Sequence, residues 1–88
     1  MLDRVNPSPA GRIATLVRQL LEKRGIAGSV GLDDDLAASG LSSLDTVNLM
    51  LAVEAAFGVK ISDRDMTPAN FRTIARIEAL VGGLPQQA

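Results

Sequence analysis

Apolar residues recur at helical spacing in three separate stretches of this chain of 88 residues. In the first stretch they form a single stripe at spacings i, i+3, i+4, i+7 and i+8, which is typical of a helix with one buried face: Ile13, Leu16, Val17, Leu20 and Leu21. Ser8 is suited to cap this helix, and Pro9 fits its first turn. Gly25 ends it, because glycine accepts a left-handed conformation. The pattern predicts a helix between these two limits.

Two further helices follow, separated by short irregular elements. The second is predicted for residues 43–57, with Gly58 as its stop. A strand-like stretch at residues 59–61 and a brief helix at about residues 66–70 come next. The last helix begins near the cap residue Thr73 and ends at the glycines 82 and 83. Its apolar positions are Ile74, Ile77, Leu80 and Val81.

A long loop at residues 25–42 joins the first two helices. It is rich in glycine and contains three consecutive acids at positions 33–35. We expect Leu32, Leu36 and Leu41 to pin it to the core. The predicted fold is an all-α bundle of three to four small helices, formed by residues 8–82. Residues 1–7 and 83–88 are predicted to be flexible tails.

The second helix has more apolar surface than one core face requires. On a helical wheel, Leu49, Met50, Val53 and Phe57 share one arc, which is wide enough to be the core face. A separate arc, close to Asn48 and Glu54, contains Leu44, Val47 and Leu51. A domain of this size does not readily bury both arcs, and an exposed apolar stripe tends to be a contact surface. The alternative is that the long loop folds over the second arc.

The chain contains no Cys and no His. Disulfides, a thiolate nucleophile, the commonest general base and a Cys/His metal site are therefore excluded. A catalytic centre of carboxylates, hydroxyls and amines stays open, but no paired acid and base stands beside a plausible nucleophile. We therefore expect no enzyme, no catalytic residue and no metal ligand.

The net charge of −1 hides an uneven distribution. Residues 1–28 contain five basic and two acidic side chains, whereas residues 29–66 contain seven acidic and two basic ones. The acidic middle would repel phosphates, which argues against nucleic acid, and it favours a partner with a basic surface. An ordinary solvated face would explain the same charges and stays an alternative.

Membrane and export signals are not evident in the sequence. No stretch approaches the ~20 apolar residues of a transmembrane helix. The first residues lack the basic start and long apolar run of a signal peptide. We therefore expect no membrane association and a cytoplasmic location.

The start of the second predicted helix has the most specific motif. The segment Gly40-Leu41-Ser42-Ser43-Leu44-Asp45 resembles the phosphopantetheine attachment motif of acyl carrier proteins, in which Gly-x-Asp-Ser-Leu opens the second helix. The resemblance continues through Glu54, Phe57, Gly58 and Ile61, where the family often reads Glu-x-x-Phe-x-x-x-Ile. In outline it covers residues 11–82. It implies that Ser43 bears a covalent 4′-phosphopantetheine arm, donated by coenzyme A, which holds cargo as a thioester.

A helix N-terminus suits this attachment, because its free N–H groups and partial positive charge favour a phosphodiester. Position alone would also fit Ser43 as an ordinary helix cap, or the cap could be Ser42. The resemblance further assigns partner contacts to three apolar and two acidic positions: Leu44, Val47, Leu51, Asp45 and Glu54.

Two departures from the family pattern narrow the expected partners. Ser42 stands where an Asp usually precedes the modified serine, and the resemblance implies that this Asp helps the transferase reaction. The second helix is also poor in acid, whereas fatty-acid carriers have a run of Glu there. The segment 40–43, together with residues 49–51, Glu54 and Phe57, is similar to stand-alone bacterial carriers that truncated synthetase-like ligases charge with an amino acid. Such a carrier need not visit the fatty-acid enzymes, which would explain both departures.

The resemblance implies a monomer that meets three kinds of enzyme. These are a phosphopantetheinyl transferase, a cargo-loading ligase or acyltransferase, and downstream enzymes of a specialised pathway. Fatty acyl, polyketide, aminoacyl and peptidyl cargo stay open, because specificity lies mostly in the partners. The alternative is an unmodified helical interaction domain that keeps the carrier fold, and Ser42 is its best support.

Overall fold

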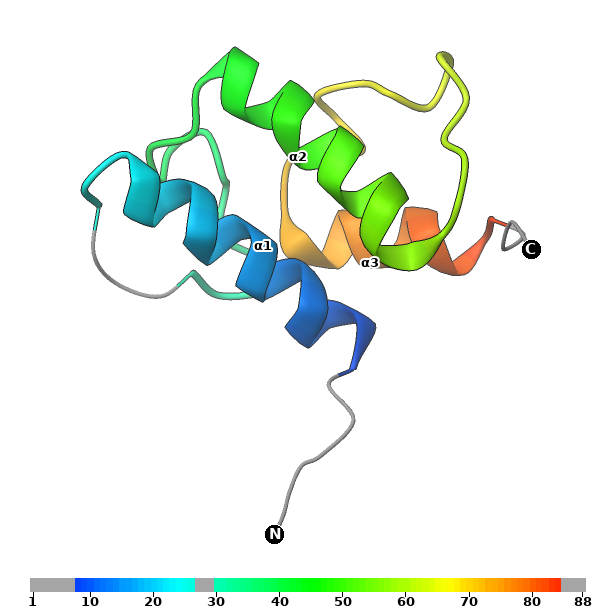
Figure 1. Ribbon diagram of the computed structural model, residues 1–88, viewed down its shortest axis with the longest axis horizontal. Helices are drawn as coiled ribbons and strands as arrows, with labels where there is room; N and C mark the ends of the chain where they lie inside the picture. The colour runs from blue at the N-terminus through cyan, green and yellow to red at the C-terminus, as the bar shows by residue number, and fades with distance from the viewer. Residues whose placement is uncertain (1–7, 27–29, 85–88) are drawn as a thin grey trace, which may run out of the picture.

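The computed structural model describes residues 8–26 and 30–84. Within these residues it contains three helices, α1 (Pro9–Lys23), α2 (Ser43–Phe57) and α3 (Ile74–Gly82), as Figure 1 shows. The predicted all-α class is therefore confirmed. The predicted caps of the first and last helices are also confirmed, since Ser8 accepts the N–H of Gly11 and Thr73 accepts that of Arg76.

Helix α1 runs antiparallel to α2 and also packs against α3. At the start of α1, the guanidinium of Arg12 lies 4.2 Å from the centroid of the Phe57 ring and donates a hydrogen bond to the carbonyl of Ala56. At the end of α1, Arg24 reaches Asp45 in the first turn of α2. Each end of the α1–α2 contact is therefore fixed by an arginine.

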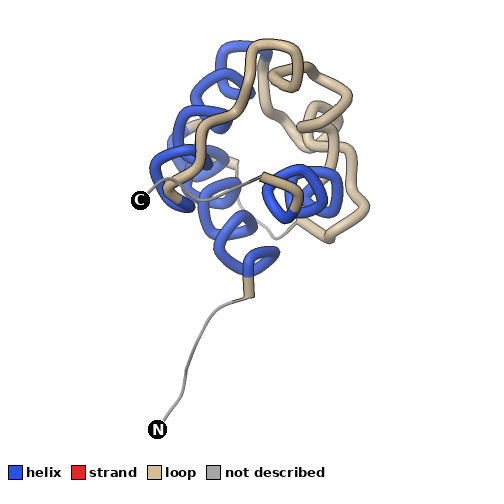
Figure 2. Tube along the Cα trace, turned by 90° about the vertical axis from the view of Figure 1, so that its right-hand side faces the viewer, coloured by secondary structure: helices blue, strands red, loops and turns tan. Residues whose placement is uncertain are grey.

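The core lies where the three helices meet the loops between them. Figure 2 shows these loops in tan beside the blue helices. The predicted core arc of α2 is confirmed, because all four of its residues are buried. The buried apolar residues are Ile13, Val17, Leu21, Leu36, Leu41, Leu49, Met50, Val53, Phe57, Val59, Ile61, Phe71, Ile74 and Ile77. Four residues of the predicted stripes of α1 and α3 are only partly buried, namely Leu16, Leu20, Leu80 and Val81.

The long loop docks beside the start of α3 through its backbone. The N–H of Leu36 donates to the carbonyl of Arg72 at 2.9 Å, and the N–H of Ala75 donates to the carbonyl of Leu32 at 3.0 Å. Leu36 and Leu41 are buried as predicted, but the prediction for Leu32 is wrong, because its side chain is half exposed. The main chain at this position provides the anchor, so the leucine is free to face solvent.

Two glycines have conformations that other residues rarely adopt. Gly58 ends α2 at φ 63°, as predicted for a helix stop. Gly40 has φ 123°, and a Cβ there would lie 2.5 Å from the Cδ1 atom of Ile26. The backbone conformation therefore favours glycine at the start of the serine motif, and a larger residue there would also have to displace the end of the Ile26 side chain.

Two minor elements differ from the prediction. Residues 66–70 form turns and no helix. Their backbone hydrogen bonds span three residues, from Asn70 to Thr67 and from Phe71 to Pro68, and the four-residue bonds of an α-helix do not follow. Residues 59–61 form only an isolated bridge at Val59. Leu84, placed in the predicted C-terminal tail, packs partly against the core. The predicted tails at residues 1–7 and 85–88 lie outside the described residues.

Shortening a side chain should cost much more stability on the buried arc of α2 than on the exposed arc. Leu49→Ala removes a side chain with 0% exposure and should lower the free energy of unfolding by about 2–5 kcal/mol. Leu51→Ala on the exposed arc should change it by less than about 0.5 kcal/mol. Urea denaturation followed by circular dichroism measures both. Equal losses for the two variants would contradict this assignment of the arcs.

Candidate functional site

Ser43 is the first residue of α2, at the junction with the long loop, and its side chain is exposed. The first N–H groups of a helix have no partner within the helix and face outward from its end. The hydrogen bonds of the described residues engage the neighbouring Ser42 and leave the hydroxyl of Ser43 unoccupied. An enzyme approaching this end of α2 would meet that hydroxyl directly.

Ser42 is the cap of α2, and every hydrogen-bonding position of its hydroxyl is used. Its Oγ accepts the N–H of Asp45 at 3.1 Å, accepts an N–H of Arg24 at 3.2 Å and donates to Oδ2 of Asp45 at 3.0 Å. A serine hydroxyl offers one donor and two acceptor sites, so none is left. Of the two possibilities left open by the sequence, the structure selects the one in which Ser42 caps and Ser43 is free.

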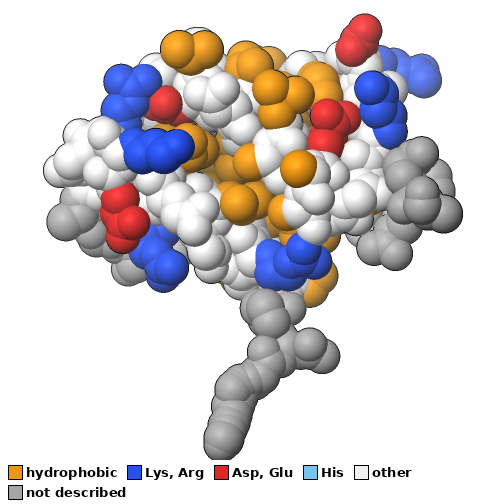
Figure 3. All heavy atoms as spheres, viewed as in Figure 1, with side chains coloured by type: hydrophobic (Ala, Val, Ile, Leu, Met, Phe, Trp, Pro, Cys, Tyr) orange, Lys and Arg blue, Asp and Glu red, His pale blue; other side chains and the backbone are white. Residues whose placement is uncertain are grey.

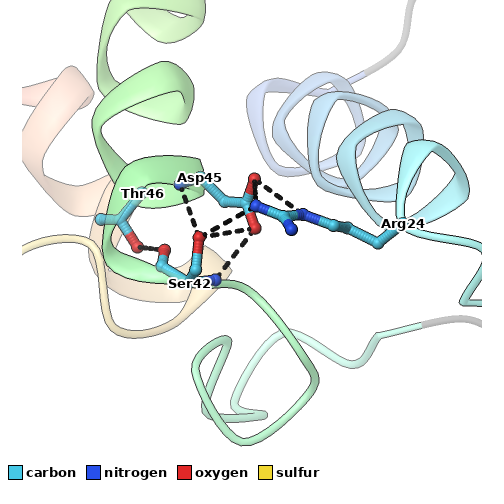
Figure 4. Close-up of polar contacts among 4 residues, drawn as sticks. All are labelled: Arg24, Ser42, Asp45 and Thr46. Carbon is cyan, nitrogen blue, oxygen red and sulfur yellow. Dashed lines mark hydrogen bonds and ion pairs between the residues drawn. The ribbon is translucent and has the colours of Figure 1, made fainter.

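Asp45 completes a capping box and is buried, with only 5% of its surface exposed. Its Oδ2 accepts the backbone N–H of Ser42 at 2.9 Å, and its Oδ1 accepts two N–H groups of Arg24 at 3.0 and 3.2 Å (Figure 4). The side-chain hydrogen bond from Arg24, followed by the N–H of Ser42, holds the pKa of Asp45 below its ordinary value. These contacts outweigh burial, which alone would raise the pKa.

Sequence reasoning missed both the capping box and the role of Arg24. The capping box had a signal, because Ser and an acid stand at the cap and three residues later. Arg24 had no comparable signal, because it lies 21 positions from Asp45. Only the antiparallel packing of α1 on α2 brings the two together.

The second arc of α2 is exposed, as its excess apolar surface predicted. The exposed fractions are 65% for Leu44, 48% for Val47 and 54% for Leu51. The long loop packs beside α3 and does not cover this arc. Hydrophobic side chains also gather in the middle of the face seen in Figure 3. We call Leu44, Val47 and Leu51 the apolar stripe.

The two acids predicted to contact partners also make contacts within the chain. Asp45 is bound to Arg24 and Ser42, as described above. Glu54 is half-buried, and its Oε2 accepts the backbone N–H of Ile61 at 2.8 Å. The exposed residues of α2 are all uncharged: Ser43, Leu44, Val47, Asn48, Leu51 and Ala55. The outer face of α2 is therefore apolar or amidic rather than acidic.

An open groove between α1 and α2 borders this face. Leu16 and Leu20 contribute from α1, and Asn48 and Ala52 from α2. The remaining lining residues are polar or charged and lie mostly toward the C-terminal end of α1: Gln19, Glu22, Lys23, Arg24 and Asp45. The groove explains why the two leucines, which the sequence placed in a buried stripe, are only partly covered. The face of α2 therefore continues onto a surface of α1 that has both apolar and charged side chains.

The N-terminal end of α2 suits a phosphodiester on Ser43. The hydroxyl is exposed, the helix end supplies N–H groups and a partial positive charge, and the half-exposed guanidinium of Arg24 lies beside Ser42. Among residues 8–26 and 30–84, no cluster of three His, Cys, Asp or Glu side chains could hold a metal ion. In the same part of the chain, no helix combines the length and apolar character needed to cross a membrane.

Comparisons with known proteins show the family of this chain. The family described as "Phosphopantetheine attachment site" matches residues 11–81. "Aminoacyl carrier protein 1" of Bradyrhizobium diazoefficiens is 40% identical over 76 residues, which cover 86% of this chain and 84% of that protein.

Two solved structures contain a similar chain. One is the Bradyrhizobium japonicum glycine:[carrier protein] ligase complexed with its cognate carrier protein and an analogue of glycyl adenylate, with a TM-score of 0.71 and 39% identity over 85% of this chain and 97% of the other. The second is the same ligase complexed with glycylated carrier protein, with a TM-score of 0.70 and 38% identity over 83% and 99%.

The small all-α fold and the match over residues 11–81 place the chain in the class of phosphopantetheine-bearing carriers. The chain belongs to this phosphopantetheine attachment family and, within it, to the aminoacyl carrier proteins. The predicted resemblance to stand-alone aminoacyl carriers is therefore confirmed. Membership implies a covalently attached 4′-phosphopantetheine as the group that holds the cargo.

The lowered pKa of Asp45 predicts a pH-dependent contribution to stability. A carboxylate whose pKa is lower in the folded state stabilises the fold above its unfolded-state pKa and loses this effect as the pH falls through its folded-state pKa. Asp45→Asn should therefore be less stable than the wild type at pH 7, with the difference shrinking below about pH 4. Urea denaturation at both pH values measures this.

The matched control is Asp63→Asn, which removes an exposed acid outside the helices. It should change the free energy of unfolding by less than about 0.5 kcal/mol at pH 7. An Asp45→Asn variant as stable as the wild type at pH 7 would contradict the role given to this carboxylate.

Proposed function

We propose that this chain holds an aminoacyl group as a thioester on a 4′-phosphopantetheine arm attached to Ser43. A cargo-loading ligase would supply the aminoacyl group, and downstream enzymes would receive it. The observation that supports Ser43 as the attachment residue is the hydrogen bonding of Ser42, which leaves only the neighbouring hydroxyl free. Aminoacyl cargo is supported by the relatives, one of which was captured in glycylated form with its ligase.

The attachment reaction requires little of this chain beyond an accessible nucleophile. The Oγ of Ser43 would form a bond to the phosphorus next to the pantetheine of coenzyme A. The phosphoanhydride bond on the other side of that phosphorus breaks, adenosine bisphosphate leaves, and the serine proton passes to a base of the transferase. We assign no catalytic residue to the carrier, and its predicted cytoplasmic location stays a prediction.

The attachment site is tested by intact mass after incubation with coenzyme A and a broad-specificity phosphopantetheinyl transferase. The wild type should gain the mass of one phosphopantetheine group, and Ser43→Ala should gain none. Ser42→Ala should still gain one group at completion, although loss of the cap should cost about 1 kcal/mol of stability. An unmodified wild type, or a modified Ser43→Ala variant, would overturn the proposal.

We further propose that partner enzymes dock on the apolar stripe. Its three side chains are exposed beside Ser43, and an apolar patch of this kind is costly to leave in water. The carboxylates of Asp45 and Glu54 are already bound within the chain, so we give them a structural role rather than a partner contact. The partner surface that fits α2 is accordingly apolar and uncharged, and not the basic one that the acidic middle of the sequence favoured.

Paired charge variants at Asn48, the exposed polar residue on this face, test the chemistry of the partner. Against an uncharged partner surface, Asn48→Glu and Asn48→Lys should each raise the KM of ligase loading roughly tenfold, because either charge must be desolvated at about 1.4 kcal/mol. Loading with glycine by the ligase of the Bradyrhizobium relative is the assay. Ala79→Glu and Ala79→Lys, on the exposed side of α3, are the controls. A lower KM for Asn48→Glu together with a higher KM for Asn48→Lys would instead indicate a basic partner surface.

A further inference from the structure

Arg24 connects the end of α1 to the serine motif. Its Nε and one terminal nitrogen donate to Oδ1 of Asp45 at 3.2 and 3.0 Å, and the same terminal nitrogen donates to Oγ of Ser42 at 3.2 Å. Figure 4 shows the guanidinium extending from α1 across to the first turn of α2. The capping box fixes Ser42 and Asp45 relative to each other, whereas Arg24 fixes both relative to α1.

This connection matters because of where Ser43 lies. It directly follows Ser42, at the point where a loop made of turns becomes a helix. Helix ends fray unless they are held by contacts outside the helix. Within the described residues, the side chain of Arg24 is the tertiary polar contact to the capping box. The orientation of Ser43 relative to the docking face of α2 therefore depends on it.

The ion pair is not an ordinary surface pair of negligible strength. Exposed pairs contribute little because water and salt screen them. Here the side chain of Asp45 is 7% exposed while that of Arg24 is 46% exposed, so removing the arginine leaves a buried carboxylate without its cation. The planar guanidinium also bonds two acceptors in one rigid geometry, which the single ammonium of a lysine reproduces poorly.

We propose that Arg24 is a positioning residue for the modification of Ser43. It acts through Ser42 and Asp45 and holds the first turn of α2 in the orientation that the transferase requires. This inference depends on the proposed attachment at Ser43. It assigns to an arginine on α1 the control of the orientation of a serine on α2.

The test compares transferase kinetics of Arg24→Gln, Arg24→Lys and the wild type, at a temperature where circular dichroism shows all three fully folded. Arg24→Gln should lower kcat about tenfold with little change in KM, because the nucleophile is misplaced while the apolar stripe is intact. Arg24→Lys should recover part of the loss. The matched control is Arg18→Gln, which removes an exposed ion pair with Glu22 on the same helix and should leave both constants unchanged.

Hydrogen exchange provides a second readout that needs no transferase. The amides of Ser43, Leu44 and Asp45 should exchange faster in Arg24→Gln, while those in the middle of α2 should not change. If Arg24→Gln does not fold, Arg24→Lys replaces it in both measurements. Its kcat should also be lower than that of the wild type, and the amides of the first turn should also exchange faster.

Two outcomes would overturn the inference. A kcat for Arg24→Gln equal to those of the wild type and Arg18→Gln would show that Arg24 does not position the serine. A loss confined to KM would show that Arg24 contacts the transferase instead. Both outcomes differ from failure of the proposed function, in which the wild type itself would stay unmodified. In that case hydrogen exchange would still show whether Arg24 stabilises the first turn of α2.

Discussion

The antiparallel contact between α1 and α2 is the interaction on which the site depends. An arginine fixes it at each end: Arg12 binds the last turn of α2, where a cation suits the helix dipole, and Arg24 binds the buried Asp45 in the first turn. Because Asp45 and Ser42 form a capping box, the contact of Arg24 with Asp45 also restrains Ser42, the residue before Ser43. The position of the exposed hydroxyl is therefore set by packing between helices as well as by local capping.

The same contact explains why α2 can be so apolar. One arc of this helix is buried against α1, α3 and the loops, while the stripe of Leu44, Val47 and Leu51 faces solvent beside Ser43. Burial of both arcs would need a layer that a domain of this size does not have. The acids that could have made the outer face negative are bound within the chain. The exposed residues of this face are therefore uncharged.

Local sequence signals predicted the helices well, because capping and termination depend on neighbouring residues. Ser8 and Thr73 cap as expected, and Gly58 ends α2 in the left-handed conformation. One error falls where a backbone contact between distant segments dominates. The carbonyl of Leu32 is held by α3, so its side chain is not needed in the core. The other error is local, because residues 66–70 close short turns with hydrogen bonds between near neighbours, such as Asn70 and Thr67.

The sequence alone predicted a serine at the start of the second helix as the attachment point, because the spacing of Gly, Ser, Leu, Glu, Phe and Ile is a local pattern. It also established a second apolar arc, because helical periodicity depends only on the order of residues. The roles of Ser42, Ser43, Asp45 and Glu54 depended on the tertiary structure. A hydroxyl or carboxylate can serve a cap, a partner or an arm, and the choice among them is made by groups distant in sequence, such as Arg24 and the backbone of Ile61.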